Sequence, residues 1–200
     1  MTERRLAVAD AASLALNPSV WGGAFVVFLA LRLEPRGWAR WVAALLGFAA
    51  VAVAPVGLLF LLKAWGRLDD VEMRSRSQRR VVYLACAGSY VAGAAALLAV
   101  RSSWPVWGVV AVQAPAALVL AAANRRWKVS IHAAGLAGIA AAALVLFGTA
   151  GLALVPLPIA GAWARWAAGA HGRSDLVLGA VIGFSVTWGG LLVLRLLVGG

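Results

Sequence analysis

The sequence predicts an all-α protein, a polytopic transmembrane bundle of six to seven helices. Hydrophobic residues make up 64% of the 200 residues, charged residues make up 12%, and the mean hydropathy is +0.91. A soluble domain is nearer half apolar and a quarter charged. Several apolar stretches exceed the ~18 residues that indicate a membrane-spanning helix. They are continuous and rich in Ala, Leu, Val and Gly, unlike the alternating strands of a membrane β-barrel.

Seven membrane crossings are predicted along a single membrane domain that covers residues 1–200. The second is the clearest, because no charge interrupts it from Trp41 to Leu62, and Pro55 predicts a kink within it. The fifth and sixth are separated only by residues 148–151, which predicts a tight hairpin. In chain order, the predicted crossings are 17–33, 41–64, 81–100, 105–123, 131–149, 151–168 and 176–197.

The basic residues favour one side of this arrangement. The net charge is +11, and the Arg residues gather in short loops, so anionic lipid headgroups or phosphates are expected as partners and nucleic acid is not. Seven crossings place 13 of the 18 Lys and Arg residues on the face that holds the N-terminus, and the positive-inside rule predicts that this face is cytoplasmic. We expect a multi-pass protein of the plasma membrane. Cys86 is the only cysteine, which excludes an intrachain disulfide and a thiolate metal site.

The only two histidines stand at polar edges of apolar stretches. His132 follows Ser130 at the start of the fifth crossing, and His171 lies between Arg165 and Asp175 in the turn from the sixth crossing to the seventh. The hydrophilic segment 65–80 precedes the third crossing. Two crossings separate each of these segments from the next, so all three return to the same face. Ionisable groups at a membrane boundary indicate a functional site.

The types and spacing of these residues favour phosphate chemistry. His171 and Asp175 are four residues apart, so on a helix the carboxylate can accept the imidazole N–H and leave the other ring nitrogen as a nucleophile. Ser130 and His132 begin a helix, where free backbone N–H groups and the helix dipole favour an anion. Arginine forks suit phosphate oxygens. We therefore expect a nucleophile, its orienting acid, an acid for the leaving group and a cationic clamp.

The pattern Arg-x5-His-x3-Asp, with Ser-x-His two crossings earlier, resembles the type 2 phosphatidic acid phosphatase superfamily. The family's third motif, Ser-Arg-x5-His-x3-Asp, reads Ala164-Arg165-x5-His171-x3-Asp175 here, and its second, Pro-Ser-Gly-His, reads Val129-Ser130-Ile131-His132. Its first motif, Lys-x6-Arg-Pro, is approached only by Arg67-x6-Arg74-Ser75. The segment 65–80 looks more like a prokaryotic membrane subgroup with Asp-x5-Arg-x2-Arg, which Asp70, Arg76 and Arg79 fit.

The resemblance implies a phosphatase-like core over about residues 60–197 and a metal-independent, cofactor-independent lipid phosphatase. By it, His171 would attack phosphorus and form a phosphohistidine, Asp175 would orient His171, and His132 would protonate the leaving oxygen and then help to activate water. The substrate would be a phosphate monoester or diphosphate of a lipid, such as a polyprenyl phosphate or phosphatidic acid. The phosphoryl oxygens would be held by Ser130, Arg165, Arg76, Arg79 and Lys128.

Two other classes of function remain open from the sequence. Asp69-Asp70 followed by Glu72 loosely suggests a magnesium-dependent prenyltransferase, although the second Asp-rich loop of such an enzyme is missing. The altered first and second motifs also fit a lipid-binding or scaffold protein with a decayed site. Ile131, in place of the glycine of the second motif, puts a branched side chain in the anion-binding turn.

Overall fold

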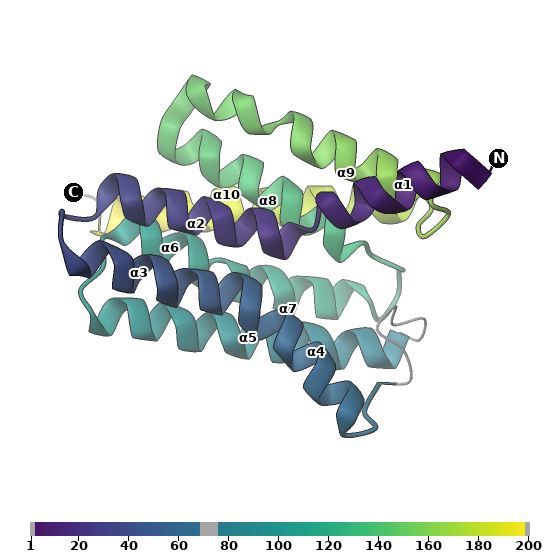
Figure 1. Ribbon diagram of the computed structural model, residues 1–200, viewed down its shortest axis with the longest axis horizontal. Coiled ribbons are helices and arrows are strands. Elements are labelled where there is room, and N and C mark those ends of the chain that lie inside the picture. The colour runs from purple at the N-terminus through teal and green to yellow at the C-terminus, as the bar shows by residue number, and fades with distance from the viewer. Residues whose placement is uncertain (1–2, 69–75, 199–200) are drawn as a thin grey trace.

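The computed structural model describes residues 3–68 and 76–198, and in these ranges the protein is a helical bundle without strands (Figure 1). Asn17 caps the second helix by accepting the backbone N–H of Ser19 at 2.9 Å, and Pro18 follows at its first position. The helices are α1 (Glu3–Ala15), α2 (Pro18–Leu33), α3 (Trp38–Phe48), the π-helix η1 (Ala49–Val53), α4 (Ala54–Ala64), α5 (Arg76–Ala99), α6 (Trp104–Ala111), α7 (Gln113–Ala123), α8 (Ile131–Phe147), the 3-10 helix η2 (Gly148–Leu154), α9 (Pro156–Ala167) and α10 (Arg173–Val198).

Within the described residues, six helical stretches are long and apolar enough to cross a membrane, so the chain is a multi-pass membrane protein. They are Ala7–Leu33, Trp38–Ala64, Gln78–Ala99, Trp104–Ala123, Ile131–Leu154 and Arg173–Val198. The predicted kink at Pro55 coincides with the π-helix η1, which ends two residues before it. A π turn re-pairs the carbonyl that a proline leaves without its N–H donor. In Figure 1, α4 bends away from the line of α3 after this point.

The predicted sixth crossing, 151–168, is not among the six stretches. After Gly148, whose φ is 57°, the chain forms η2 and then only twelve residues of α-helix in α9. Both segments pack against α8, and Figure 1 shows α9 leading back to the end of the bundle that holds the N-terminus. The chain therefore reaches the turn before α10 on the expected side, although this segment is not one continuous spanning helix.

Helices α8 and α10 form the most extensive packing in the bundle, and glycines permit it. A Cβ added at Gly183 would overlap the backbone of Ala134, and one at Gly179 would overlap the backbone of Ser130. Close backbone approach through small residues is how helices associate without a hydrophobic driving force between them. This close approach brings the start of α8 directly against α10.

We expect Gly183→Ala to destabilise the protein by about 1–3 kcal/mol, because the added methyl group must push two backbones apart. Gly189→Ala on the same helix is the matched control, since nothing lies within 4 Å of its added Cβ, and it should be neutral or slightly stabilising. Thermal unfolding of both variants in detergent measures the difference. Equal stability of the two variants would show that the α8–α10 contact is loose.

Candidate functional site

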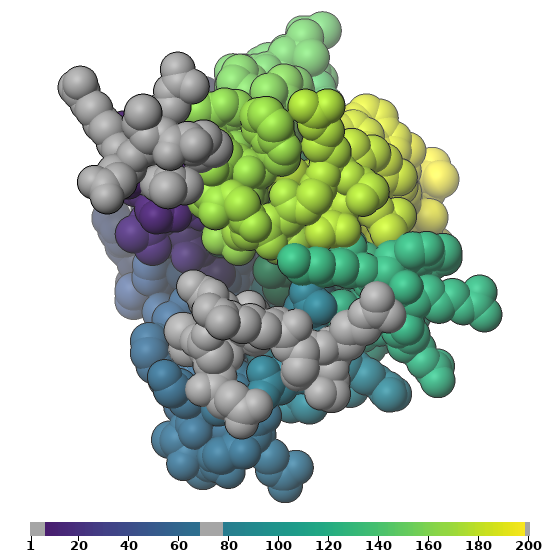
Figure 2. Space-filling model, turned by 90° about the vertical axis from the view of Figure 1, so that its right-hand side faces the viewer, coloured from purple at the N-terminus to yellow at the C-terminus, as the bar shows by residue number. Residues whose placement is uncertain are grey.

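A cavity of about 720 Å³ opens at the end of the bundle that carries the N-terminus. Its lining comes from all seven predicted crossings and from the turn after α9, so segments far apart in the chain meet there. Figure 2 faces this end and shows the α9–α10 turn beside the turn at 124–130. The ionisable side chains in the described lining, other than Tyr and Cys, are Asp10, Arg79, Lys128, His132, Arg165 and His171. One described residue of segment 65–80, Arg79, therefore lies around the same cavity as His132 and His171.

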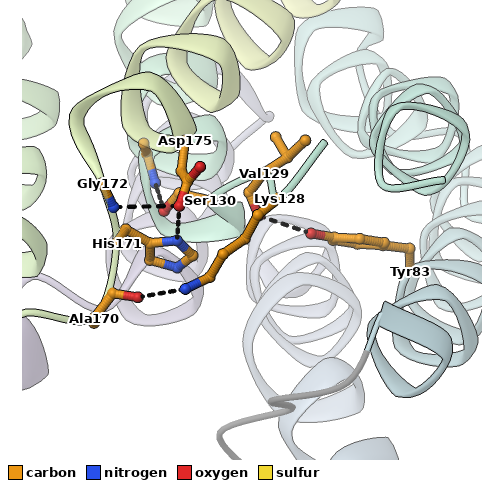
Figure 3. A network of polar contacts seen from close by, with 9 residues as sticks. Tyr83, Lys128, Val129, Ser130, Ala170, His171, Gly172 and Asp175 are labelled. Carbon is orange, nitrogen blue, oxygen red and sulfur yellow. Dashed lines mark hydrogen bonds and ion pairs between the residues drawn. The ribbon is translucent and has the colours of Figure 1, made fainter. Parts of the chain in front are cut away.

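His171 and Asp175 pair as their spacing predicts (Figure 3). Nδ1 of His171 lies 3.5 Å from Oδ2 of Asp175, which is longer than a well-formed hydrogen bond. The same oxygen accepts the backbone N–H of Gly172 at 3.2 Å, and Asp175 stands in the first turn of α10, where a carboxylate is favoured. Asp175 lies behind the imidazole and is not among the residues that line the cavity. The carboxylate thus faces one ring nitrogen, and the opposite edge of the ring is left for the cavity.

The turn between Arg165 and His171 is held by local backbone geometry. Helix α9 ends at Ala167, and Gly169, two residues on, has a φ of 70°, the left-handed conformation that glycine adopts without strain. The N–H of Ala170 then donates to the carbonyl of Arg165 at 3.1 Å, and Nζ of Lys128 donates to the carbonyl of Ala170 at 3.1 Å. The five-residue spacing between Arg165 and His171 is therefore a helix C-cap that turns the chain so that both side chains reach the cavity.

Ser130 acts as a helix cap and as a tie between two segments of the site. Its Oγ accepts the N–H of Ala133 at 3.3 Å, and its own N–H donates to the carbonyl of Asp175 at 3.1 Å. The residue is fully buried and is not among the described residues lining the cavity, whereas its neighbour His132 is. The structure thus brings His132 to the cavity and places Ser130 behind it. A phosphate ligand role for Ser130 stays a prediction from the motif.

Ser13 on α1 is a site residue that the sequence analysis missed. Its carbonyl lies 3.3 Å from Nε2 of His132, and its Oγ accepts from Nη1 of Arg165 at 3.2 Å. The side chain of Ser13 is buried, as is Ala9 one turn earlier on α1. One residue therefore joins the imidazole of the fifth predicted crossing to the guanidinium of the sixth. No motif marks Ser13, and the only hint in the sequence is a polar residue among the small residues Ala11, Ala12 and Ala15.

Arg79 supplies a buried positive charge to the cavity from α5. Its side chain is buried, and its Nε has no hydrogen-bond partner in the part of the chain that the structure describes. One turn further on, Tyr83 donates its hydroxyl to the carbonyl of Val129 at 3.2 Å and so fixes the segment that carries Lys128. Arg76 is the first residue of α5, and its side chain lies outside the described residues. A buried guanidinium beside a cavity indicates an anionic ligand.

The surroundings of His171 keep its imidazole neutral. Burial, followed by the positive charges of Arg165 and Lys128, lowers the pKa of His171 to about 4, while Asp175 acts in the opposite direction. An unperturbed histidine has a pKa near ~6.5. At neutral pH the ring is therefore uncharged and keeps one lone pair for a nucleophilic attack. Asp175 raises proton affinity and would stabilise the ring once it becomes positively charged.

We expect the His171 ring to stay neutral from pH 7 down to about pH 5 and to protonate only near pH 4. The sign follows from the cause, because burial and neighbouring cations both disfavour the protonated form. NMR of ¹³C-histidine in a His132→Gln variant gives a single ring signal to titrate. A midpoint near the ordinary pKa of ~6.5 would mean that the ring is solvated and that the cations are remote.

Other candidates from the sequence do not enter this cavity or fall outside the described residues. Arg67 is exposed and is not among the described residues lining the cavity. Residues 69–75, which include Asp69, Asp70, Glu72 and Arg74, lie outside the described ranges. Within residues 3–68 and 76–198, no three His, Cys, Asp or Glu side chains gather in a way that could hold a metal ion. The apparent partial fit to the first motif of the family therefore receives no support from Arg67.

The arrangement combines a neutral imidazole backed by a carboxylate, a second imidazole and the cations Arg79, Lys128 and Arg165 around one cavity. Groups of these kinds bind an anionic ester, attack its phosphorus and neutralise the charge that develops. No protein-family model, curated protein or solved structure matches the chain, so its function is inferred from its sequence motifs and this geometry.

Proposed function

We propose that the protein is an integral-membrane lipid phosphatase of the type 2 phosphatidic acid phosphatase superfamily. It hydrolyses a phosphate monoester or diphosphate of a lipid without a metal ion. The observation that carries the proposal is the convergence of His132, Arg165 and the His171–Asp175 pair on a cavity that also holds Arg79 and Lys128. The sequence predicts all six of these residues as site residues.

The reaction proceeds in two displacements at phosphorus. The lone pair of a His171 ring nitrogen attacks phosphorus, and the bond from phosphorus to the lipid oxygen breaks as a protonated His132 gives that oxygen its proton. The anionic phosphoryl group favours the protonated form of His132 when it binds. In the second step His132 takes a proton from water, the water oxygen attacks phosphorus, and the phosphorus–nitrogen bond breaks to release phosphate.

The cations around the cavity hold the phosphoryl group through both steps. The guanidinium of Arg165 exchanges the Ser13 hydroxyl for a phosphoryl oxygen, and Arg79 and Lys128 neutralise the remaining charge. Such donors are already in place before the reaction and cost no reorganisation in the transition state. We further propose that the site faces the cytoplasm of a plasma-membrane protein, because the seven predicted crossings assign 13 of the 18 basic residues to its side of the membrane.

The direct test is phosphate release from farnesyl diphosphate, phosphatidic acid and phosphatidylglycerol phosphate by the purified protein. We expect release that continues in EDTA. A strict requirement for magnesium would favour the prenyltransferase class instead. Absence of release from every member of the panel would overturn the proposal in favour of a binding or scaffold role, provided that a cooperative thermal unfolding transition shows that the protein is folded.

A further inference from the structure

The cavity continues from its cationic end into the apolar interior of the bundle. Its deeper lining includes Phe25, Val51, Val109, Ile139 and Ala142, all of which belong to the largest cluster of buried hydrophobic residues. The charged residues of the lining come from the opposite end, at α1, the start of α5 and the turns around 128 and 170. One continuous space therefore has an anion-binding head and a mainly apolar shaft, which is the polarity of a lipid. The amide of Gln113 also lines the shaft, and its Nε2 donates to the carbonyl of Val109 at 3.3 Å.

Three helix runs give the same depth for this shaft. The lining residues extend over Arg79–Tyr90 on α5, Val109–Leu120 on α6 and α7, and Ile131–Ala142 on α8. Each range covers eleven residue steps, or about 16 Å at the rise of an α-helix. The cationic end lies at Arg79 and His132, and the far end lies at Tyr90, Val109 and Ala142. The cavity thus runs along most of the shared length of these helices and is not confined to its mouth.

We propose that the shaft binds the tail of a single-chain phosphate ester inside the bundle, and that its depth limits the tail to about 12–14 backbone carbons. An extended peptide backbone advances about 3.6 Å over the three bonds of a residue, or about 1.2 Å per bond. At the same advance per bond, an extended alkyl chain of about 13 bonds fills the shaft. The volume of about 720 Å³ lies in the upper range of ligand cavities. The identity of the head group rests on the proposed function; the length limit rests on the shaft.

Binding of n-alkylphosphonates from butyl to hexadecyl tests the limit without any turnover. Measured against free aqueous ligand, affinity should rise about fourfold with each methylene and stop rising near 12–14 carbons. Val109→Phe fills the far end and should move this break two or three carbons shorter. Val119→Phe is the matched control and should leave the break at the same chain length. Val119 lies on the same helical run, is 41% exposed and is not among the described residues lining the cavity. Butylphosphonate binding should be equal in all three proteins, which shows that the head site and the fold are intact.

Photolabelling of the wild-type protein locates the tail directly, even where Val109→Phe does not fold. A dodecylphosphonate with a terminal diazirine should label the far-end residues on α6 and α8, including Val109 and Ile139. Labelling of lipid-facing residues such as Val119 or Val177, or affinity that rises to hexadecyl in every variant, would overturn the tail site. Short phosphonates that bind with no length dependence would do the same and leave the proposed phosphatase standing. Failure of every phosphonate, and of inorganic phosphate, to bind would overturn both.

Discussion

His171→Gln should abolish phosphate release, with a loss of at least about 10⁴-fold in kcat, because it removes the group that forms the covalent intermediate in the proposed mechanism. Glutamine keeps an amide N–H that can face Asp175, so the turn after α9 should survive the change. Phosphate release from the best lipid of the panel, in EDTA, measures the effect. A variant that retains a tenth of the wild-type rate would show that water attacks phosphorus directly and that His171 only binds the substrate.

His132→Gln is the matched control and separates the two histidine roles. It removes the acid for the leaving oxygen and the base for water, but it leaves the nucleophile in place. With an activated ester such as p-nitrophenyl phosphate, which needs little protonation to leave, the variant should release one equivalent of nitrophenol and then stall. The trapped phosphate should be stable to alkali, labile to acid and located at His171 by mass spectrometry. Alkali-labile phosphate at another residue would contradict the assigned nucleophile.

Asp175→Asn should lower kcat by between about a hundredfold and ten-thousandfold while the fold is kept. The contacts to His171 and to the N–H of Gly172 both end on one oxygen of Asp175, and an asparagine Oδ1 can replace that oxygen in both. The carbonyl that accepts from Ser130 belongs to the backbone and is unaffected. The change therefore removes the negative charge and little else, and the imidazole loses the anion that stabilises its positive form.

The control for this change is Asp10→Asn, which neutralises a carboxylate in the cavity lining and should change kcat by less than tenfold. The Asp175→Asn variant should also protonate His171 at a still lower pH than the wild type, since the carboxylate raises the proton affinity of the ring. The NMR titration measures this independently of activity. An unchanged rate together with an unchanged titration would mean that the pair only holds the turn.

The spacing of apolar stretches predicted the bundle well because a spanning helix leaves a long and simple signal. Counting crossings also predicted which polar segments share a face, since that needs only parity. The sixth crossing was harder to predict, because Gly148, Pro156 and Pro158 punctuate an apolar stretch that a hydropathy pattern reads as uniform. The structure uses that stretch as a 3-10 segment and a short helix, which shows that apolar length alone does not determine helix continuity.

Contacts that join distant segments left no signal that a single sequence could reveal. Ser13 contacts His132 and Arg165, which follow it by 119 and 152 positions in the chain. Nothing in the sequence around Ser13 indicates these contacts. Glu34 at the opposite end of the bundle is similar, because its Oε1 accepts from the hydroxyls of Ser102 and Ser103 at 2.6 and 2.8 Å and from the N–H of Ser103 at 2.7 Å. Ser130 matched a motif by residue type but serves as a cap. Residue identity predicted chemistry here, and only geometry assigned each residue its partner.

The backbone bond from Ser130 to Asp175 has a consequence for how a substrate reaches the phosphorus-binding position. With Gly179 and Gly183 fitted against the same stretch of α8, the two histidine-bearing segments cannot separate without breaking the tightest packing in the molecule. The two segments therefore behave as one rigid unit. On the other side of the site, α1 is held by the two bonds of Ser13 and by a smaller packing against α9. We therefore expect an entering lipid head to displace α1 and to leave α8 and α10 together.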